Sequence, residues 1–315
     1  MKRPIPPTRT PPGPRPSLSG ACYRLTLEYD GTGFSGWQEQ KNARSIVGEL
    51  KSALADAGFE VVDLGGSGRT DAGVHALAQV AHLRLSRPTD PPSLANALNS
   101  RLPGGIQVLS VEPTSPRFHA RHDAQARCYL YQLSRRRTAF AKRYVWWVKD
   151  ELDLARMREA AQHLLGRRDY ALFAEPGGTP EKSTLVDMVG VEVEEQGALV
   201  LLRFVASHFL WKMVRRLTGT LVEIGAGRLD LADFVQLLEA EPLPAAKGRP
   251  TLWTAPASGL FLERILYRDE PPLGPLSAVT PLKTAAEIRA QPAENKRRPP
   301  ERRRPHPADR PKRWK

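Results

Sequence analysis

The central part of this chain alternates between stretches with the period of a β-strand and stretches with the period of an α-helix. CYRLTLEY at residues 22–29 alternates polar and apolar side chains, as a half-buried strand does. The next stretch places Ile46, Leu50 and Leu54 at helical spacing behind a candidate N-cap, Ser45. This alternation predicts mixed α and β structure, and it excludes a coiled coil or a collagen-like chain.

The order of the expected elements limits the fold further. Strands are expected at 59–64, 79–86, 106–113, 126–134, 184–194, 198–206 and 258–268, and helices at 45–58, 92–101, 154–166, 208–225 and 230–240. The second half repeats the order of the first in pattern only, without a residue-level repeat. We therefore expect an α+β fold of two α/β subdomains, whose mainly antiparallel sheets form a central sheet covered by helices. The active site is expected in the cleft between the halves.

Charge separates the two ends of the chain from its body. The net charge is +13, but residues 1–20 carry four Lys or Arg and no acid, and residues 271–315 carry twelve against four acids. These two ends also hold 17 of the 29 prolines. Because like charges repel and proline removes a backbone donor, we expect both ends to be disordered. The basic C-terminal tail is interpreted either as a solubilising end or as a non-specific grip on a polyanion.

Between the tails, the expected domains are an N-terminal subdomain at 21–115 and a C-terminal subdomain at 116–270. No stretch of the chain is apolar enough for a membrane span, and the first twenty residues lack the apolar core of a secretory signal. Cys22 and Cys128 are the only cysteines, which argues against a disulfide framework. We therefore expect a cytoplasmic protein that does not bind a membrane.

The loop GGSGRTDAGVHA at 65–76 is the strongest candidate for a reactive site. It places Arg69, Thr70, Asp71 and His75 among four glycines. An arginine two residues before an aspartate can orient the carboxylate and keep it ionised, as a nucleophile or a general base requires. The glycines would let a phosphodiester backbone approach closely. A purely structural turn remains the alternative.

Two other segments suggest partners for this loop. In Met213-Val214-Arg215-Arg216, an arginine within an apolar helix is expected to reach a carboxylate or a phosphate, although a solvated face is the alternative. Tyr129 and Tyr131 lie on one face of a predicted strand, where they are either core residues or a surface on which a base stacks.

Two further motifs do not indicate a cofactor or a metal. Residues 31–36 match the dinucleotide-binding pattern G-x-G-x-x-G, but no helix signal starts at the motif, so no helix N-terminus would meet a pyrophosphate. His119 and His122 have a metal-ligand spacing, but Arg117 and Arg121 would repel a cation. We expect neither a cofactor nor a metal.

Together these segments resemble the TruA family of tRNA pseudouridine synthases. The resemblance rests on segments that follow the family's order over roughly residues 21–268, and the GRTDAGVHA stretch is the most specific. They are YDGTGFSGWQEQ (29–40), RSIVGEL (44–50), GRTDAGVHALAQVAHL (68–83), FHAR (118–121), RCYLY (127–131), FLWKMVRRLTGTLVEIGAGR (209–228) and APASGLFLERILY (255–267).

The resemblance implies the pseudouridine synthase fold and the cofactor-free isomerisation of uridine to pseudouridine in tRNA. Asp71 matches the catalytic aspartate and Arg69 the arginine associated with displacing the target nucleotide. Tyr129 matches the tyrosine that stacks on the flipped base, and Arg215 the arginine that pairs with the aspartate. The resemblance also implies a homodimer that acts on the anticodon stem-loop, at tRNA nucleotides 38, 39 and 40.

Some features depart from the family pattern or lie outside it. Cys128 precedes the matched tyrosine, and His208 stands where a small polar residue is common. The basic tail has no place in the pattern. A catalytically silent RNA-binding protein with the same sheet remains the alternative function.

Overall fold

The structure is a computed structural model that describes residues 20–176, 183–268 and 270–289. The first half contains β1 (Ala21–Tyr29), α1 (Ile46–Asp56), β2 (Val61–Gly66), β3 (His75–Leu85), α2 (Pro91–Asn99) and β4 (Ile106–Pro113). The second half contains β5 (Ala126–Ser134), β6 (Trp146–Trp147), α3 (Leu154–Gln162), β7 (Gly166–Asp169), η1 (Ala171–Phe173), β8 (Leu185–Gln196), β9 (Leu199–Ala206), α4 (Met213–Gly225) and α5 (Leu231–Leu238). The short turns η2 (Ala245–Lys247) and η3 (Ala257–Gly259) precede β10 (Leu260–Leu266), and α6 (Ala285–Arg289) follows it.

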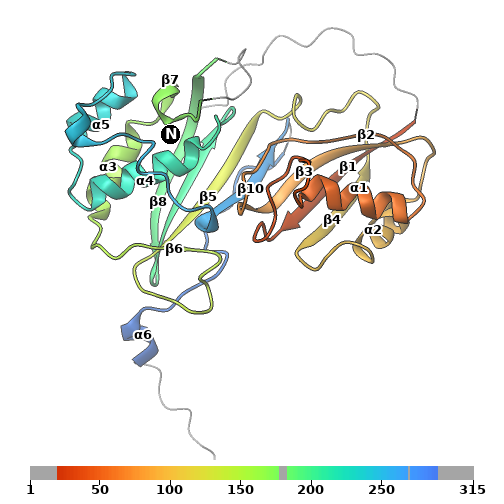
Figure 1. The fold of residues 1–315 in the computed structure, drawn as a ribbon, viewed down its shortest axis with the longest axis horizontal. Coiled ribbons are helices and arrows are strands. Elements are labelled where there is room, and N and C mark those ends of the chain that lie inside the picture. Colours follow the sequence, from red (N-terminus) through yellow and green to blue (C-terminus); the bar gives the residue numbers. More distant parts are fainter. Residues whose placement is uncertain (1–19, 177–182, 269, 290–315) are drawn as a thin grey trace, which may run out of the picture. The chain divides into compact units, whose positions relative to one another are not determined.

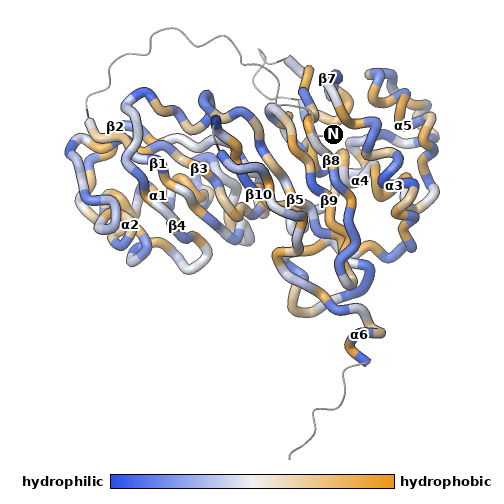
Figure 2. Tube along the Cα trace, turned by 180° about the vertical axis from the view of Figure 1, so that it is seen from behind, coloured by the Kyte–Doolittle hydropathy of each residue, from blue (hydrophilic) through white to orange (hydrophobic). Residues whose placement is uncertain are grey.

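In the described part of the chain, ten strands form one sheet with the order β4-β1-β3-β10-β5-β9-β8-β7, while β2 pairs with β3 and β6 with β5. Most neighbours are antiparallel, but β10 runs parallel to β3 and β6 parallel to β5. The last strand thus joins the two halves, with β1 to β4 on one side of β10 and β5 to β9 on the other (Figure 2). The expected α+β fold with a mainly antiparallel central sheet is confirmed.

The two faces of the sheet have different covers. Helices α1 to α5 lie on the face that Figure 1 presents. Alternation along β9 sends Val200, Leu202 and Phe204 into the main core with these helices, and sends Leu199 and Leu201 into a smaller core on the other face. We call these the helix face and the back face.

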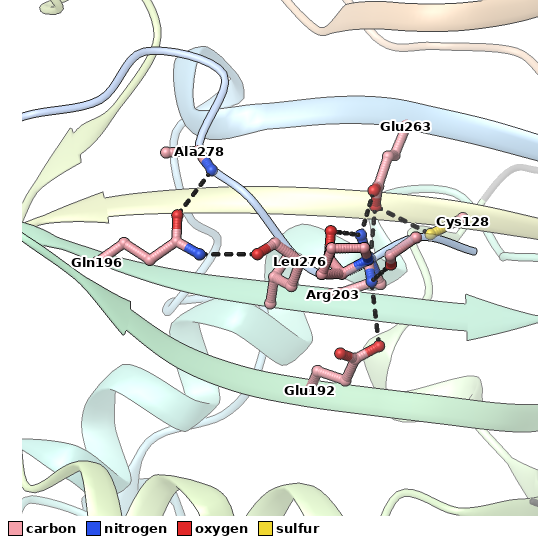
Figure 3. Close-up of polar contacts among 9 residues, drawn as sticks. Cys128, Glu192, Gln196, Arg203, Glu263, Leu276 and Ala278 are labelled. Carbon is pink, nitrogen blue, oxygen red and sulfur yellow. Dashed lines mark hydrogen bonds and ion pairs between the residues drawn. The ribbon is translucent and has the colours of Figure 1, made fainter.

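The back face is covered by residues 270–282, which we call the C-terminal strap. Leu276 is buried in the small core, and Gln132 of the sheet accepts from the Val279 amide. Figure 3 shows the contacts of Arg203 and Gln196 with the strap. Arg203 donates to the carbonyls of Gly274 and Pro275, and Gln196 binds Leu276 and Ala278.

The compact unit of the chain therefore ends at Leu282 rather than at residue 270. Proline-rich sequence indicated a disordered tail from residue 271, but buried side chains hold this stretch against the sheet. The rest of the expected C-terminal tail, from residue 290, lies outside the described residues, as do residues 1–19 of the N-terminal tail. Helix α6 belongs to a second unit that begins at Lys283.

Element boundaries otherwise follow the sequence to within four residues: α3 ends at Gln162 rather than at residue 166, and β3 begins at His75 rather than at residue 79. One further difference is informative. The helix expected at 208–225 begins only at Met213, because Lys212 adopts the left-handed conformation with φ of 60° and breaks the helical path. The short strands β6 and β7 were not expected. No helix among the described residues is long and apolar enough to cross a membrane.

Candidate active site

The Asp71 loop, residues 67–74, connects β2 to β3 and is fixed by backbone hydrogen bonds. The Trp37 amide donates to the Thr70 carbonyl at 3.1 Å, and the Gly73 amide donates to the Phe34 carbonyl at 3.2 Å. The hydroxyls of Tyr29 and Thr70 lie 2.8 Å apart. The segment after β1 therefore holds the loop on both sides of Asp71.

Two glycines of the G-x-G-x-x-G motif make this contact possible. A Cβ on Gly36, whose φ is +95°, would lie 2.4 Å from the Thr70 carbonyl oxygen. A Cβ on Gly31 would lie 2.1 Å from the Val74 carbonyl oxygen. Both distances are impossible for a real side chain, so the motif is needed for the close packing of two loops.

Asp71 and Arg215 meet where the two halves of the fold join. Arg215, in the first turn of α4, places Nη1 3.5 Å from Asp71 Oδ2. The Nε atom of Arg215 donates to the Ala255 carbonyl at 2.7 Å, which fixes the guanidinium. The two side chains are only 24% and 17% exposed. The long Nη1–Oδ2 distance leaves a weak ion pair rather than a closed one.

Burial raises the pKa of Asp71 above its ordinary value, while the positive charges of Arg215 and Lys212 oppose that rise. A carboxylate that has lost much of its water and whose ion pair is loose is a more reactive group than a surface aspartate. The arrangement is therefore suited to nucleophilic attack at neutral pH.

Arg69 does not have the place that its spacing from Asp71 suggested. The arginine that contacts Asp71 among the described residues is Arg215, while Arg69 is exposed and lies near Arg121. The structure therefore gives no support to the expectation that Arg69 orients the carboxylate, since Arg69 is not among the groups that act on Asp71. The neighbour of Arg215 on α4, Arg216, pairs instead with Glu175.

Tyr129 lies on β5, on the helix face beside the Asp71 loop. It is 8% exposed, and its ring meets Phe209 edge-on at 5.0 Å between centroids. Burial raises the pKa of Tyr129, and nearby Tyr29 and Asp71 raise it further, so the phenol stays protonated at neutral pH. Tyr131 is buried in the core on the same face and donates to the Pro256 carbonyl.

Two residues that sequence analysis did not assign also hold this site. Arg127 donates to the carbonyl of Ser67, at the start of the Asp71 loop, and to that of Arg121 at 2.7 Å. His75, at the end of the loop, accepts from the Gly31 amide at Nδ1 and lies 3.0 Å from the Arg143 carbonyl at Nε2. Burial lowers the pKa of His75, although Asp30 opposes this. The GRTDAGVHA motif could have pointed to His75, since this histidine begins a buried strand.

The second histidine motif forms a turn. The rings of His119 and His122 lie 4.2 Å apart, and His119 also packs on His82 at 4.4 Å. Among the described residues, no three His, Cys, Asp or Glu side chains are placed to hold a metal ion together.

The chain is similar in sequence to known proteins over most of its length. The model of a family described as tRNA pseudouridine synthase matches residues 26–123 and 160–268. Curated proteins named tRNA pseudouridine synthase A from Brucella ovis, Brucella canis and Brucella suis are each 39% identical to this chain over 250 residues, covering 78% of this chain and 97% of theirs. The chain belongs to the tRNA pseudouridine synthase family.

Within this family, the matched ranges contain Asp71, Arg69 and Arg215. Tyr129 and the loop that follows β5 lie in the interval 124–159, which the family model does not match. The recognition made from GRTDAGVHA and its neighbouring segments is therefore confirmed, while the role of each residue remains a prediction.

Proposed function

We propose that this chain isomerises uridine to pseudouridine in tRNA, with Asp71 as the nucleophile. The carboxylate of Asp71 attacks the nucleoside, and the bond between the sugar and uracil N1 breaks. The uracil turns and its C5 bonds to the sugar carbon while the bond between that carbon and Asp71 breaks, which regenerates the carboxylate. The C5 proton is then lost while N1 gains one. Atoms and electrons balance without an oxidant or a reductant, so the proposed reaction uses no cofactor.

The observation that carries this proposal is the Asp71–Arg215 pair. The carboxylate is largely withdrawn from solvent, is held at 3.5 Å from one guanidinium, and lies in a loop fixed on both sides. An RNA-binding protein without activity has no need for a buried carboxylate whose ionisation is opposed by its surroundings. Family membership gives the same reaction class.

The other residues have proposed roles around the nucleophile. Arg215 keeps Asp71 ionised, and Tyr129 provides the ring on which the flipped uracil stacks. Arg69, which is exposed, displaces the target nucleotide from its stem. A base in an A-form stem must leave its stack before its glycosidic bond can be attacked, so a displacing cation beside the nucleophile suits this chemistry.

The finer points of the function are also proposals. The TruA resemblance supports a cytoplasmic homodimer that modifies the anticodon stem-loop at nucleotides 38, 39 and 40. Light scattering on the purified chain would test the dimer, and mapping of pseudouridine in a strain that lacks the gene would test the target nucleotides.

The deciding experiment incubates the protein with an unmodified tRNA transcript and detects pseudouridine by carbodiimide treatment and primer extension. We expect new stops at uridines of the anticodon arm with the wild-type chain, and none with Asp71→Asn or Asp71→Ala. Free uracil in place of pseudouridine would indicate hydrolysis of the glycosidic bond. Tight binding without either product would indicate the silent RNA-binding protein.

A further inference from the structure

The loop between β5 and α3 carries a concentration of charge that the active site does not use. Residues 135–149, which we call the basic-aromatic loop, hold six Lys or Arg and no Asp or Glu. The loop projects from the end of β5, in yellow-green in Figure 1. Its charge contrasts with the nearly neutral body of the chain, so this surface attracts an anionic partner.

Two of the four aromatic residues of the loop are exposed. Phe140 is 98% exposed and Trp147 is 40% exposed. The guanidinium of Arg137 lies over the Trp147 ring, 5.2 Å from its centroid. Contact between large apolar side chains and water is unfavourable, and a partner that covers these side chains removes it.

The cations of the loop are largely available to a partner. Arg135 is paired with Glu195 at 2.5 Å. Arg137, Lys142, Arg143 and Lys149 are exposed, and none of them forms an ion pair with a residue of the described part of the chain.

The base of the loop is rigidly attached although its tip is exposed. Ala141 and Val145 are each 4% exposed and belong to the small core of the back face. The Tyr144 carbonyl accepts from Gln132 at 2.8 Å, and the Tyr144 hydroxyl donates to Asp30 at 2.9 Å. Phe140 is therefore presented by a preformed loop, which reduces the entropy cost of binding.

The loop is also close to the nucleophile. His75 binds the Arg143 carbonyl at 3.0 Å and follows Asp71 by four residues. Four residues span at most about 14 Å. A nucleic acid that places a uridine at Asp71 therefore has neighbouring nucleotides within reach of this loop.

We propose that the basic-aromatic loop is a second RNA-contacting surface, on which Arg137, Lys142 and Arg143 bind phosphates and Phe140 stacks on an unpaired base. The proposal rests on the proposed function in taking RNA as the ligand. Phosphate contacts supply most of the affinity for nucleic acid, and exposed aromatic rings bind unpaired bases without reading sequence. The family model does not match this interval.

A second copy of the chain is the less suitable occupant. A twofold interface centred on this loop would bring its exposed cations, Arg137, Lys142 and Arg143, close to the same cations of the second copy. A partner protein with an acidic surface would satisfy the charges but would leave the exposed ring of Phe140 without a stacking partner. RNA satisfies both features.

The test measures the affinity of an unmodified tRNA transcript at several salt concentrations, in an Asp71→Asn background so that binding is separated from chemistry. Replacing Arg137, Lys142 and Arg143 together by alanine should weaken binding at low salt by more than tenfold. Each lost phosphate contact lowers the slope of log Kd against log salt by about 0.7–0.9, so the slope should fall by about 2. The matched control replaces the exposed Arg87, Arg101 and Arg249 by alanine, and it should change the slope by less than half as much.

Variants of Phe140 separate stacking from charge. Stacking of one base on a ring corresponds to about 5- to 150-fold in affinity. Phe140→Leu should therefore weaken binding at least fivefold, while Phe140→Trp should bind as tightly as the parent. Because the side chain is exposed, both variants should keep the melting temperature of the parent.

Two results would overturn the proposal. One is a triple variant whose affinity and salt slope equal those of the control. The other is a Phe140→Leu variant that binds RNA normally but changes the oligomeric state in light scattering, which would assign the loop to a second copy. If the wild-type chain forms pseudouridine and the loop variants bind RNA as tightly as the protein without loop changes, this inference alone would be refuted. If binding depends on the loop but the wild-type chain, which keeps Asp71, forms no pseudouridine, the proposed function alone would be refuted.

Discussion

Cys128 and Tyr129 are neighbours on β5, yet they belong to two different arginine–carboxylate sites. On the helix face, Tyr129 lies beside Asp71 and Arg215, whose closest nitrogen and oxygen are 3.5 Å apart. On the back face, Cys128 donates to Glu263, and Arg203 binds both oxygens of the same carboxylate at 2.5 and 2.9 Å (Figure 3). One strand thus supports a loose ion pair and a closed one.

The difference between the two pairs follows from what surrounds them. Arg203 is 3% exposed and also bonds to Glu192 and to two carbonyls of the C-terminal strap, so its donors are satisfied within the protein. The ion pair between Asp71 and Arg215 is long, at 3.5 Å, and the Asp71 side chain remains 24% exposed. A closed pair stabilises a fold, whereas a carboxylate that is to attack a substrate must keep free lone pairs.

The strap should have the largest effect on stability. Deleting residues 271–315 exposes the small core around Leu276 and leaves hydrogen-bonding groups of Arg203, Gln196 and Gln132 without partners. Together these losses should lower the free energy of unfolding by more than about 4 kcal/mol. Urea denaturation would measure this.

The matched control deletes only residues 283–315, which contain all twelve Lys and Arg of the C-terminal tail. This shorter deletion should leave the free energy of unfolding unchanged, while it weakens tRNA binding at low salt and lowers the salt slope. Equal instability of the two deletions would show that the strap does not hold the back face.

Breaking the closed pair should be the next largest effect. Arg203→Met leaves Glu263 without its cation in a site that water barely reaches, which should cost about 3–5 kcal/mol of stability. Arg135→Met removes an exposed pair with Glu195 and should cost less than about 1 kcal/mol. The folded fraction of Arg203→Met should retain its kcat. A large fall in kcat would connect the back face to the chemistry.

Replacing the cation of the loose pair should mainly change activity. Arg215→Lys should lower kcat by about 10-fold and Arg215→Met by about 10²-fold, since each weakens a charge that favours the reactive carboxylate. Because Arg215 lowers the pKa of Asp71, its removal should move the acid limb of the pH–rate profile to higher pH. An acid limb at the same pH in both variants would show that Arg215 does not act on the nucleophile.

The smallest effect is expected at Cys128. Its thiol donates to Glu263 at 3.0 Å, and a serine hydroxyl can donate in the same direction. Cys128→Ser should therefore change stability by less than about 1.5 kcal/mol and leave pseudouridine formation intact. An inactive but folded Cys128→Ser would require a different catalytic centre.

Sequence patterns predicted most of what builds the helix face. Period-two and helical patterns located nearly every strand and helix, and the GRTDAGVHA loop singled out Asp71 before any comparison. The assignment of Arg215 needed the family resemblance, because adjacent arginines on one helix do not show which of them reaches a carboxylate. The expectation for Arg69 lacks support for the same reason: spacing along a loop does not give the direction of a side chain.

The back face was predicted poorly for a physical reason. Residues 270–282 are rich in proline, and no local pattern shows that they pack on a sheet. They are fixed by Gln132, Gln196 and Arg203, which lie about 70 to 150 residues earlier in the chain. The role of the G-x-G-x-x-G motif in the packing of the Asp71 loop likewise became visible only in three dimensions.

The most direct test of this account is the free energy of unfolding of Asp71→Asn between pH 4 and pH 7, measured beside its activity. The folded-state pKa of Asp71 is raised from its ordinary value of 3.8, so ionisation opposes folding, and this cost appears as the pH rises through that pKa. We predict that Asp71→Asn forms no detectable pseudouridine, a loss on the order of 10⁴-fold or more. We also predict that its stability gains on the wild type as the pH rises. A variant that forms pseudouridine at an appreciable rate, or that loses stability relative to the wild type over this range, would contradict the account.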